Sequence, residues 1–383
     1  MSHEVLVAAA GIVPFSKKSE QSADLLAATA IRDLFGSGVD PALVDEAYFG
    51  SAKGGGLIGQ RSLRFTGLAS GLPVFNVENA CASGGVAFHL AHRAIAAGDI
   101  SCALVVGVDR LSVLGKGTLP VQETEWDGRS GMTNPVVYAM RARRYMHETG
   151  ATAADLASVT VKSRHFAAMN PVAHMRTPLT VEEVLASRPI ADPITLYQCS
   201  PKSDGAAAVL LVSEERARRA GLDGPRVRAS VVTSGMFSMA ERDITRPDIT
   251  QRASSAAYEK AGVGPEDLDV VELHDAFTLA ELLYTEELGL CADGEGVDHL
   301  RSGASASLEA SGNAVVNPSG GLMGRGHPIG ATGVAQIVEC VGQLRGRAGA
   351  RQRSAARTAM AHVTGGGASG FDNGACSVTI LTN

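Results

Sequence analysis

Aromatic residues are scarce in this chain, since phenylalanine, tryptophan and tyrosine together make up only 4% of its 383 residues. It has no apolar run long enough to span a bilayer, and its polar start carries no signal-peptide pattern. The six cysteines include no Cys-x-x-Cys pair, so neither a zinc ribbon nor a disulfide framework is indicated. The net charge of −6 disfavours nucleic acid as a partner. We therefore expect a cytoplasmic protein with free thiols, no resident metal and no membrane contact.

What the sequence does contain is typical of a globular α/β protein. Hydrophobic residues make up 45% of the chain and charged residues 19%, and the length predicts two domains. The 44 glycines suit many tight turns between strands and helices.

Apolar patterning predicts two series of alternating strands and helices. In the first series, strands are expected at 5–10, 46–49, 74–78, 103–108 and 206–212, and helices at 21–36 and 82–97. In the second, strands are expected at 227–233, 268–273, 356–363 and 375–381, and helices at 250–261, 277–288 and 330–344. Such alternation predicts a mostly parallel sheet covered on both faces. We predict one half over 1–225, with an inserted loop subdomain at about 112–200, and a second half over 226–383.

The two halves look like copies of one topology. In the first, a strand ends in Asn79-Ala80-Cys81 before a helix, and in the second, a strand ends in Leu273-His274-Asp275 before a helix. If these turns are equivalent, they face one another at strand ends, where open α/β sheets bind ligands.

Cys81 is the first candidate for chemistry. It precedes a predicted helix, where unpaired N–H groups and the positive end of the helix dipole favour a thiolate. The small residues that follow, Ala82 to Gly85, allow a substrate to come close. A free cysteine is also a common core residue, and position alone does not separate the two interpretations.

His327 is the second candidate, in a loop from Asn317 to Gly333 that holds six glycines and this single histidine. Pro328 fixes the backbone before the next helix and so aims the imidazole. The loop lacks a Walker lysine, which disfavours a role in binding phosphate. His327 is better suited to act as a general base or as an oxyanion donor.

His274 and the glycine run at 365–370 are weaker signals when each is taken alone. A histidine at a strand end is often structural, and a glycine run is often a plain turn, although it can also bring N–H groups to a developing oxyanion. A basic stretch over 345–357 predicts a solvated linker, with contact to a ligand phosphate or a partner protein as the alternative.

In combination, these motifs resemble the thiolase superfamily. The resemblance rests on Cys81 in an Ala-Cys-Ala-Ser-Gly-Gly setting, on the Gly-His-Pro run ending at Gly333 and on the late glycine loop, and it covers nearly the whole chain. His274 lies in His-Asp-Ala-Phe, where ordinary thiolases have Asn-Glu-Ala-Phe, and this resembles the sterol-carrier-protein-type branch. The resemblance implies two α/β halves stacked in five α-β-α-β-α layers, with coenzyme A as co-substrate and no permanently bound cofactor.

The resemblance also implies a mechanism. Cys81, activated by His327, would take an acyl group from a 3-ketoacyl-CoA and pass it to a second acceptor. One oxyanion hole would use the Cys81 N–H and the late loop, and the other would use His327 together with His274 or a water that it holds. The loop residues concerned are Gly366, Gly367 and Ala368.

One departure from the family concerns the second catalytic thiol. Ordinary thiolases place it where this chain has Val363, and sterol-carrier-type enzymes place it where this chain has Ala276. The acid/base at the α-carbon is therefore open between His274, our first candidate, and His362, our second.

The resemblance implies partners as well. It implies a homodimer, and chains with His-Asp-Ala-Phe often pair with a small OB-fold zinc-ribbon protein that helps to hold the CoA thioester, giving a heterotetramer. No basic CoA-clamping loop is evident in 112–200, which is consistent with help from such a partner.

Three other functions stay open beside thiolysis and its reverse, Claisen condensation. A retro-aldol lyase on a 3-hydroxyacyl-CoA needs no nucleophile, so the intact setting of Cys81 disfavours it. A decarboxylative condensation like that of ketoacyl synthases would use Cys81, His274 and His327. A non-catalytic homologue would bind acyl-CoA without acyl transfer.

Overall fold

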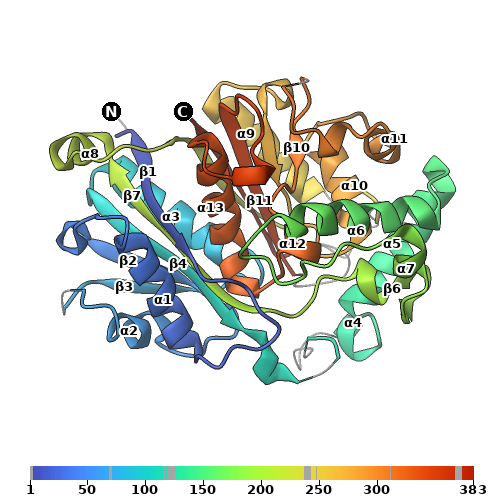
Figure 1. Cartoon of the computed structure of the whole chain (residues 1–383), viewed down its shortest axis with the longest axis horizontal. Coiled ribbons are helices and arrows are strands. Elements are labelled where there is room, and N and C mark those ends of the chain that lie inside the picture. Colours follow the sequence, from blue (N-terminus) through green and yellow to red (C-terminus); the bar gives the residue numbers. More distant parts are fainter. Residues whose placement is uncertain are drawn as a thin grey trace.

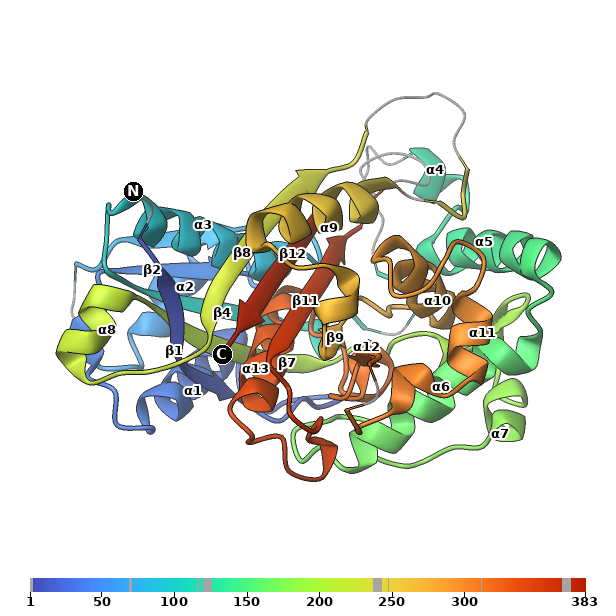
Figure 2. The ribbon, with the colours of Figure 1, turned by 90° about the horizontal axis from the view of Figure 1, so that it is seen from above.

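The computed structural model describes residues 3–68, 71–115, 117–119, 126–236, 243–246, 248–310, 312–366 and 373–383. Ten of its strands join in the order β10-β9-β11-β12-β8-β1-β7-β4-β2-β3 (Figures 1 and 2). The first half contributes β1 (Val5–Ile12), β2 (Glu46–Gly50), β3 (Val74–Val77), β4 (Cys102–Arg110) and β7 (Asp204–Ser213). The second contributes β8 (Arg226–Ser234), β9 (Val270–Glu272), β10 (Val315–Val316), β11 (Thr358–Gly365) and β12 (Ala375–Thr382).

The two sets of five strands have one topology, as the sequence predicted. Read outward from the middle, their orders are β1-β7-β4-β2-β3 and β8-β12-β11-β9-β10. The two sets meet where Leu6 of β1 pairs with Arg226 of β8. The division at 225 and 226 itself stays a prediction.

The expectation of a mostly parallel sheet is wrong. In each set, two neighbouring pairs are parallel and two are antiparallel, and β1 and β8 are antiparallel to each other. The last strand of each half, β7 or β12, enters between two earlier strands and runs against both. Both strands are buried throughout almost their whole length, so their apolar runs look the same in either direction.

Helices complete five layers (Figure 1). Helices α1 (Ala23–Phe35) and α2 (Ile58–Leu63) cover the outer face of the first half, and α9 (Asp248–Ala261) and α10 (Thr278–Glu287) cover that of the second. Helices α3 (Ser83–Ala97) and α13 (Thr332–Leu344) lie between the halves and contact strands of both. Almost every residue of α13 is buried, because the helix has strands on two sides. The layers expected from the thiolase resemblance are confirmed.

Between β4 and β7 the chain forms mainly helices, and the bounds predicted for an inserted subdomain stay a prediction. This segment contains α4 (Trp126–Arg129), α5 (Asn134–Thr149), α6 (Ala153–Ala168), α7 (Val181–Leu185) and a hairpin of β5 (Pro189–Ala191) and β6 (Ile194–Thr195). Figure 1 shows α5, α6 and α7 together, beside the second half. The remaining helices are α8 (Glu214–Ala220), α11 (Gly296–Arg301) and α12 (Gly321–Gly324). None of the helices in the described part of the chain is long and apolar enough to cross a membrane.

In the second half, the turn equivalent to that of Cys81 is not the turn of His274, which the sequence predicted. Cys81 lies between β3 and α3, whose counterparts in the second half are β10 and α13, so its equivalent is the loop that carries His327. His274 follows β9, the counterpart of β2. The expected equivalence of Cys81 and His274 is therefore wrong, although both lie at the same end of the sheet.

The basic stretch is not a solvated linker. Arg351 is buried and pairs with Glu339 of α13 at 3.0 Å, and Arg353, which is 2% exposed, donates to the Asn313 carbonyl at 3.2 Å. Arg345 donates to the Ala8 carbonyl at 2.9 Å. These guanidinium groups tie the segment before β11 to its surroundings.

Candidate functional site

The turn before α3 presents the sulfur of Cys81. Ala80 has a φ of +47°, in the left-handed region that non-glycine residues rarely adopt. Ser83 stabilises this conformation, because its hydroxyl accepts from the Asn79 N–H at 2.9 Å and donates to the Ala80 carbonyl at 2.6 Å. The Glu78 carboxylate accepts from the Ala80 N–H at 2.8 Å. A strained turn that is held this well is typical of a functional position.

Two glycines allow other segments to come close to this turn. A Cβ on Gly84 would lie 2.5 Å from the carbonyl oxygen of Gly330, in the loop of His327. A Cβ on Gly365, at the end of β11, would lie 2.3 Å from the carbonyl oxygen of Asn79. Both positions therefore require glycine, and both bring the second half of the chain to Cys81.

His327 contacts Cys81 directly, with 3.3 Å between Nε2 and Sγ. Its Nδ1 lies 2.7 Å from the Thr332 hydroxyl, which donates its own proton to the Pro328 carbonyl at 3.0 Å. The hydroxyl must therefore accept from Nδ1–H, which places the imidazole proton on Nδ1. The unprotonated Nε2 faces the thiol and is ready to accept its proton.

Asp109, which no sequence motif indicated, fixes the loop of His327. Its fully buried carboxylate, at the end of β4, accepts from the Gly330 N–H at 2.6 Å, the Ser51 hydroxyl at 2.8 Å and the Ala52 N–H at 3.0 Å. A buried carboxylate is stable only with such partners. The available signal was an acidic residue at the end of a run of apolar ones.

His274 completes a cluster of three. Its ring is edge-on to that of His327, with 5.1 Å between the centroids, and ligand-type atoms of Cys81, His274 and His327 all lie within 4.8 Å of one another. His274 is 3% exposed, and its buried Nδ1 has no hydrogen-bond partner among the described residues. The cluster unites a nucleophile with two imidazoles that can exchange protons.

Both partners of the Cys81–His327 contact are neutral, contrary to the expected thiolate. Burial raises the pKa of Cys81 to about 12, and the charge of Asp109 acts in the same direction. Backbone N–H groups of Gly366 and Cys81 oppose this shift without cancelling it. Burial, together with nearby Arg325, lowers the pKa of His327 to about 3. The positive potential at the start of α3 is too weak to offset the loss of hydration that a Cys81 thiolate would suffer.

Comparison with known proteins identifies the family. The thiolase N-terminal domain matches residues 5–215, and the thiolase C-terminal domain-like family matches residues 229–374. The chain belongs to the thiolase family.

Three curated relatives show where in the family it lies. It is 43% identical to benzoylsuccinyl-CoA thiolase subunit BbsB of Thauera aromatica over 96% of both chains. It is 39% identical to an acetyl-CoA acetyltransferase of Methanothermobacter thermautotrophicus, over 90% of this chain and 91% of that one. It is 33% identical to sterol carrier protein 2 of Gallus gallus, over 96% of this chain and 71% of that one.

A solved structure agrees with this placement. The chain resembles a component of the Ltp2-ChsH2(DUF35) aldolase with a TM-score of 0.83 and 28% identity, over 99% of this chain and 97% of that one. The thiolase-like branch related to sterol carrier protein 2 is thereby supported, as the sequence predicted.

In this thiolase, His362 supports His274 and does not join the cluster. It is fully buried, and its Nε2 lies 3.1 Å from the Thr250 hydroxyl. Its Nδ1 accepts from the backbone N–H of His274 at 3.5 Å. Both ring nitrogens are thus engaged by neighbours, which leaves neither free for a substrate.

The positions of the missing second thiol are filled by apolar side chains. Val363 is 2% exposed and belongs to a small buried cluster, and Ala276 packs on the core of the second half. Cys199 comes near, because its backbone pairs with that of Phe277, but its thiol donates to the Thr195 carbonyl at 3.6 Å. Cys81 is the only thiol of the described residues in the histidine cluster.

The late glycine loop is described in part. The backbone of Gly366 lowers the pKa of Cys81, which agrees with an oxyanion-hole donor at this position. Gly367 and Ala368 lie outside the described residues.

The raised thiol pKa has a measurable consequence. Alkylation by iodoacetamide proceeds through the thiolate, so the logarithm of the rate at Cys81 should rise by about one per pH unit up to pH 10 without a plateau. A free model thiol, measured in parallel, should level off above about pH 8.5. The rate is followed by mass spectrometry of the Cys81 peptide, and a plateau below pH 9 would show that the resting sulfur is not a high-pKa thiol.

Thr332 should act as a positioning residue for His327. In Thr332→Val the buried Nδ1–H loses its acceptor, so we expect about 1–3 kcal/mol lower unfolding free energy and roughly tenfold lower kcat. Thr332→Ser retains the hydroxyl and should recover most of both. Denaturant unfolding and steady-state kinetics provide the two measurements, and equal behaviour of the valine and serine variants would contradict the assigned hydrogen bond.

Proposed function

We propose that this thiolase-type acyltransferase works through an acyl-Cys81 intermediate, cleaving a 3-ketoacyl-CoA with CoA or running the reverse condensation. The observation that carries the proposal is the 3.3 Å contact between the Cys81 thiol and an imidazole nitrogen whose lone pair faces it. The neutral pair favours transfer of the proton at the moment of attack, when the electrophile makes the sulfur more acidic.

The first half-reaction balances with the groups present. Cys81 Sγ bonds to the 3-keto carbon while its proton moves to His327 Nε2, and the carbonyl oxygen becomes an oxyanion. The carbonyl re-forms and the C2–C3 bond breaks, and its electron pair passes to C2 of the departing acetyl-CoA, which takes up a proton. Acyl-Cys81 and acetyl-CoA result, and His327 must then lose its proton.

The second half-reaction regenerates the thiol. The sulfur of CoA attacks the acyl-Cys81 carbonyl and gives its proton to a base, and Cys81 leaves and regains a proton. His327 can serve both proton transfers, since its Nε2 contacts the sulfur. We assign one oxyanion to the N–H groups of Cys81 and Gly366, which also favour the Cys81 thiolate, and the other to His327 together with His274 or a water that it holds.

We assign the α-carbon proton to His274, which would accept this proton in the condensation direction and, in cleavage, would deliver to C2 the proton that His327 takes from Cys81. Burial and the neighbouring histidines lower its pKa well below the usual range, so the ring is neutral and able to accept a proton. Its unpartnered Nδ1 supports a functional role, because a buried polar atom is seldom left unpaired. His274→Asn introduces the amide of ordinary thiolases, so it tests whether donation alone suffices at this position.

Further proposals concern the partners and the location. A small OB-fold zinc-ribbon partner is supported by the DUF35 component in the aldolase structure and by the word subunit in the name of the Thauera relative. We also propose a homodimer, and therefore a heterotetramer. All six cysteines are free, which supports a reducing, cytoplasmic location.

A retro-aldol lyase is the second candidate. It is favoured by the name of the aldolase structure and by the missing second thiol, which condensing thiolases use at the α-carbon. Such a reaction breaks a C–C bond beside a hydroxyl and does not acylate Cys81.

Intact mass measurement tests the proposed function. The protein is incubated with acetyl-CoA and with longer and aromatic acyl-CoAs, each with and without any co-encoded small partner, and the adduct is mapped. Aromatic substrates belong in the panel because a 43% identical relative is named for benzoylsuccinyl-CoA. An acyl adduct on Cys81 is expected, and its absence under every condition would favour the lyase or a non-catalytic homologue.

A further inference from the structure

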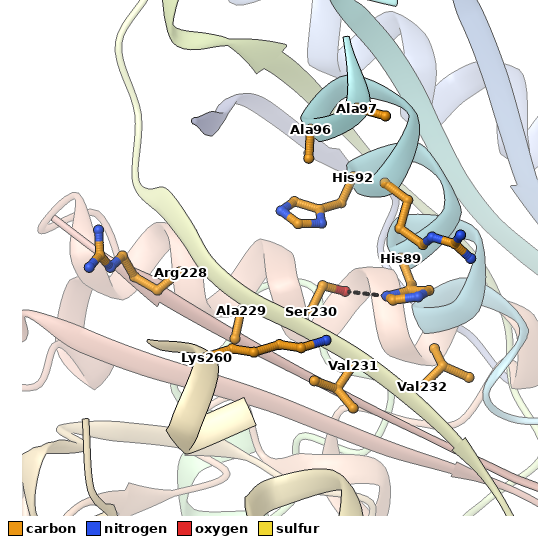
Figure 3. A pocket seen from close by; sticks show the side chains of 11 residues that line it. His89, His92, Ala96, Ala97, Arg228, Ala229, Ser230, Val231, Val232 and Lys260 are labelled. Carbon is orange, nitrogen blue, oxygen red and sulfur yellow. Dashed lines mark hydrogen bonds between the residues drawn. The ribbon is translucent and has the colours of Figure 1, made fainter. Parts of the chain in front are cut away.

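A cavity of about 560 Å³ lies away from the catalytic cluster, between α3, β8 and the end of α9 (Figure 3). Five basic side chains line it, and the other lining residues are apolar or serine, so no carboxylate faces the space. The basic residues are His89, His92, Arg93, Arg228 and Lys260. They come from three elements that are far apart in the sequence.

None of the three permanent cations has a partner among the described residues. Arg93, Arg228 and Lys260 make no ion pair and no side-chain hydrogen bond with any residue that the structure describes, whereas elsewhere Arg301 pairs with Asp155 at 2.8 Å. The helix dipole explains only Lys260, which lies in the last turn of α9. Arg93 precedes the last turn of α3, and Arg228 is on a strand. In a chain of net charge −6, this concentration of uncompensated positive charge requires another explanation.

The two histidines add neutral hydrogen-bonding groups. His89 Nδ1 lies 3.2 Å from the Ser230 hydroxyl, while His92 Nδ1 is buried without a hydrogen-bond partner among the described residues. Figure 3 shows the His92 ring and the Lys260 side chain extending toward the space between α3 and β8. Burial and neighbouring cations lower the pKa of both histidines to about 4, so neither adds charge at neutral pH.

We propose that this cavity binds a ligand bearing phosphate groups. Its volume lies within the range of small-molecule sites, about 300–1,000 Å³. Arginine and lysine are the usual partners of phosphate, through paired and point-charge contacts respectively. The site is distinct from the catalytic cluster, because at about 1.5 Å per helical residue His89 lies roughly 12 Å along α3 from Cys81. The proposal is therefore independent of the acyl-transfer chemistry.

Calorimetric titration of the full chain at low ionic strength tests the proposal. Inorganic pyrophosphate and adenosine 3′,5′-bisphosphate are the two probes, because they separate a bare oligophosphate ligand from a nucleotide. One site per chain is expected, with an affinity that falls as salt is added. The double variant Arg228→Glu/Lys260→Glu should weaken binding at least tenfold. Arg218→Glu, on the exposed helix α8, is a control that changes charge in the same direction and should bind like the wild type.

Three outcomes would overturn the proposal. The first is that neither probe binds the wild type at millimolar concentration. The second is that the control variant and the double variant weaken binding equally. The third is that the wild type binds neither probe and the double variant changes its oligomeric state. The last would assign the cavity to contact with a second copy. Unchanged basal turnover and unfolding midpoint in the double variant establish that it is folded, so a loss of binding reports on the cavity itself.

Discussion

Cys81→Ser should lower acyl-transfer turnover by about 10⁴-fold or more and abolish the covalent adduct. A serine hydroxyl is a much weaker acid and a poorer nucleophile than the thiol, so the His327 imidazole, whose pKa is about 3, removes its proton far less readily. The strained turn at Ala80 would still present the side chain, so the loss is chemical and not structural. Stopped-flow thiolysis and intact mass are the measurements.

A matched cysteine variant is available as the control. Cys291→Ser makes the same chemical change at a partly exposed thiol outside the cluster and should leave turnover within about twofold of the wild type. Retention of a tenth of wild-type thiolysis by Cys81→Ser would remove the nucleophile from the mechanism. Full retention of 3-hydroxyacyl-CoA cleavage, with thiolysis absent from both proteins, would identify the lyase.

Much of the fold could be predicted because buried strands and helices are visible as local patterns of apolar residues. The strands β4 and β7 are buried on both faces, and such positions appear in the sequence as unbroken apolar runs. Strand direction could not be predicted from those runs, since they do not depend on the direction of the neighbour. The prediction that the two halves share one topology is confirmed, but the predicted equivalence of the Cys81 and His274 turns is wrong. Which turns correspond depends on the order of the strands in the sheet, and the sequence does not show that order.

The site could be predicted only where the residue types themselves carry the chemistry. Cys81 and His327 were found through motifs, and the structure brings them into contact across 246 residues of sequence. Asp109 was missed because its four bonded groups come from two distant loops. The protonation of Cys81 was also wrong, because a local feature, the helix start, was weighed without the burial that tertiary packing imposes. Arg351 looked like a solvated charge for the same reason, since its partner Glu339 lies on α13.

His327→Asn should lower kcat/KM by about 10³–10⁴-fold, because the imidazole is the only basic nitrogen in contact with the Cys81 sulfur among the described residues. The asparagine amide can still donate to an oxyanion but cannot accept the thiol proton, so acylation should fail while acyl-CoA binding remains. Single-turnover acylation and equilibrium binding of a non-reactive CoA thioether separate these two effects. His165→Asn on the exposed face of α6 is the control and should match the wild type.

The pH profile of the wild type provides an independent test of the same assignment. A base must be unprotonated to act, and the His327 pKa of about 3 means that this holds down to roughly pH 4. kcat/KM should therefore stay level between pH 7 and 5, where an enzyme that depends on an ordinary histidine of pKa about 6.5 would lose about 25-fold. An acid limb near pH 6.5 in the wild type, together with normal acylation by His327→Asn, would transfer the role of base to another group. If the limb is absent and acylation by the variant fails, the proton passes from Cys81 to a neutral, buried imidazole, as the 3.3 Å contact implies.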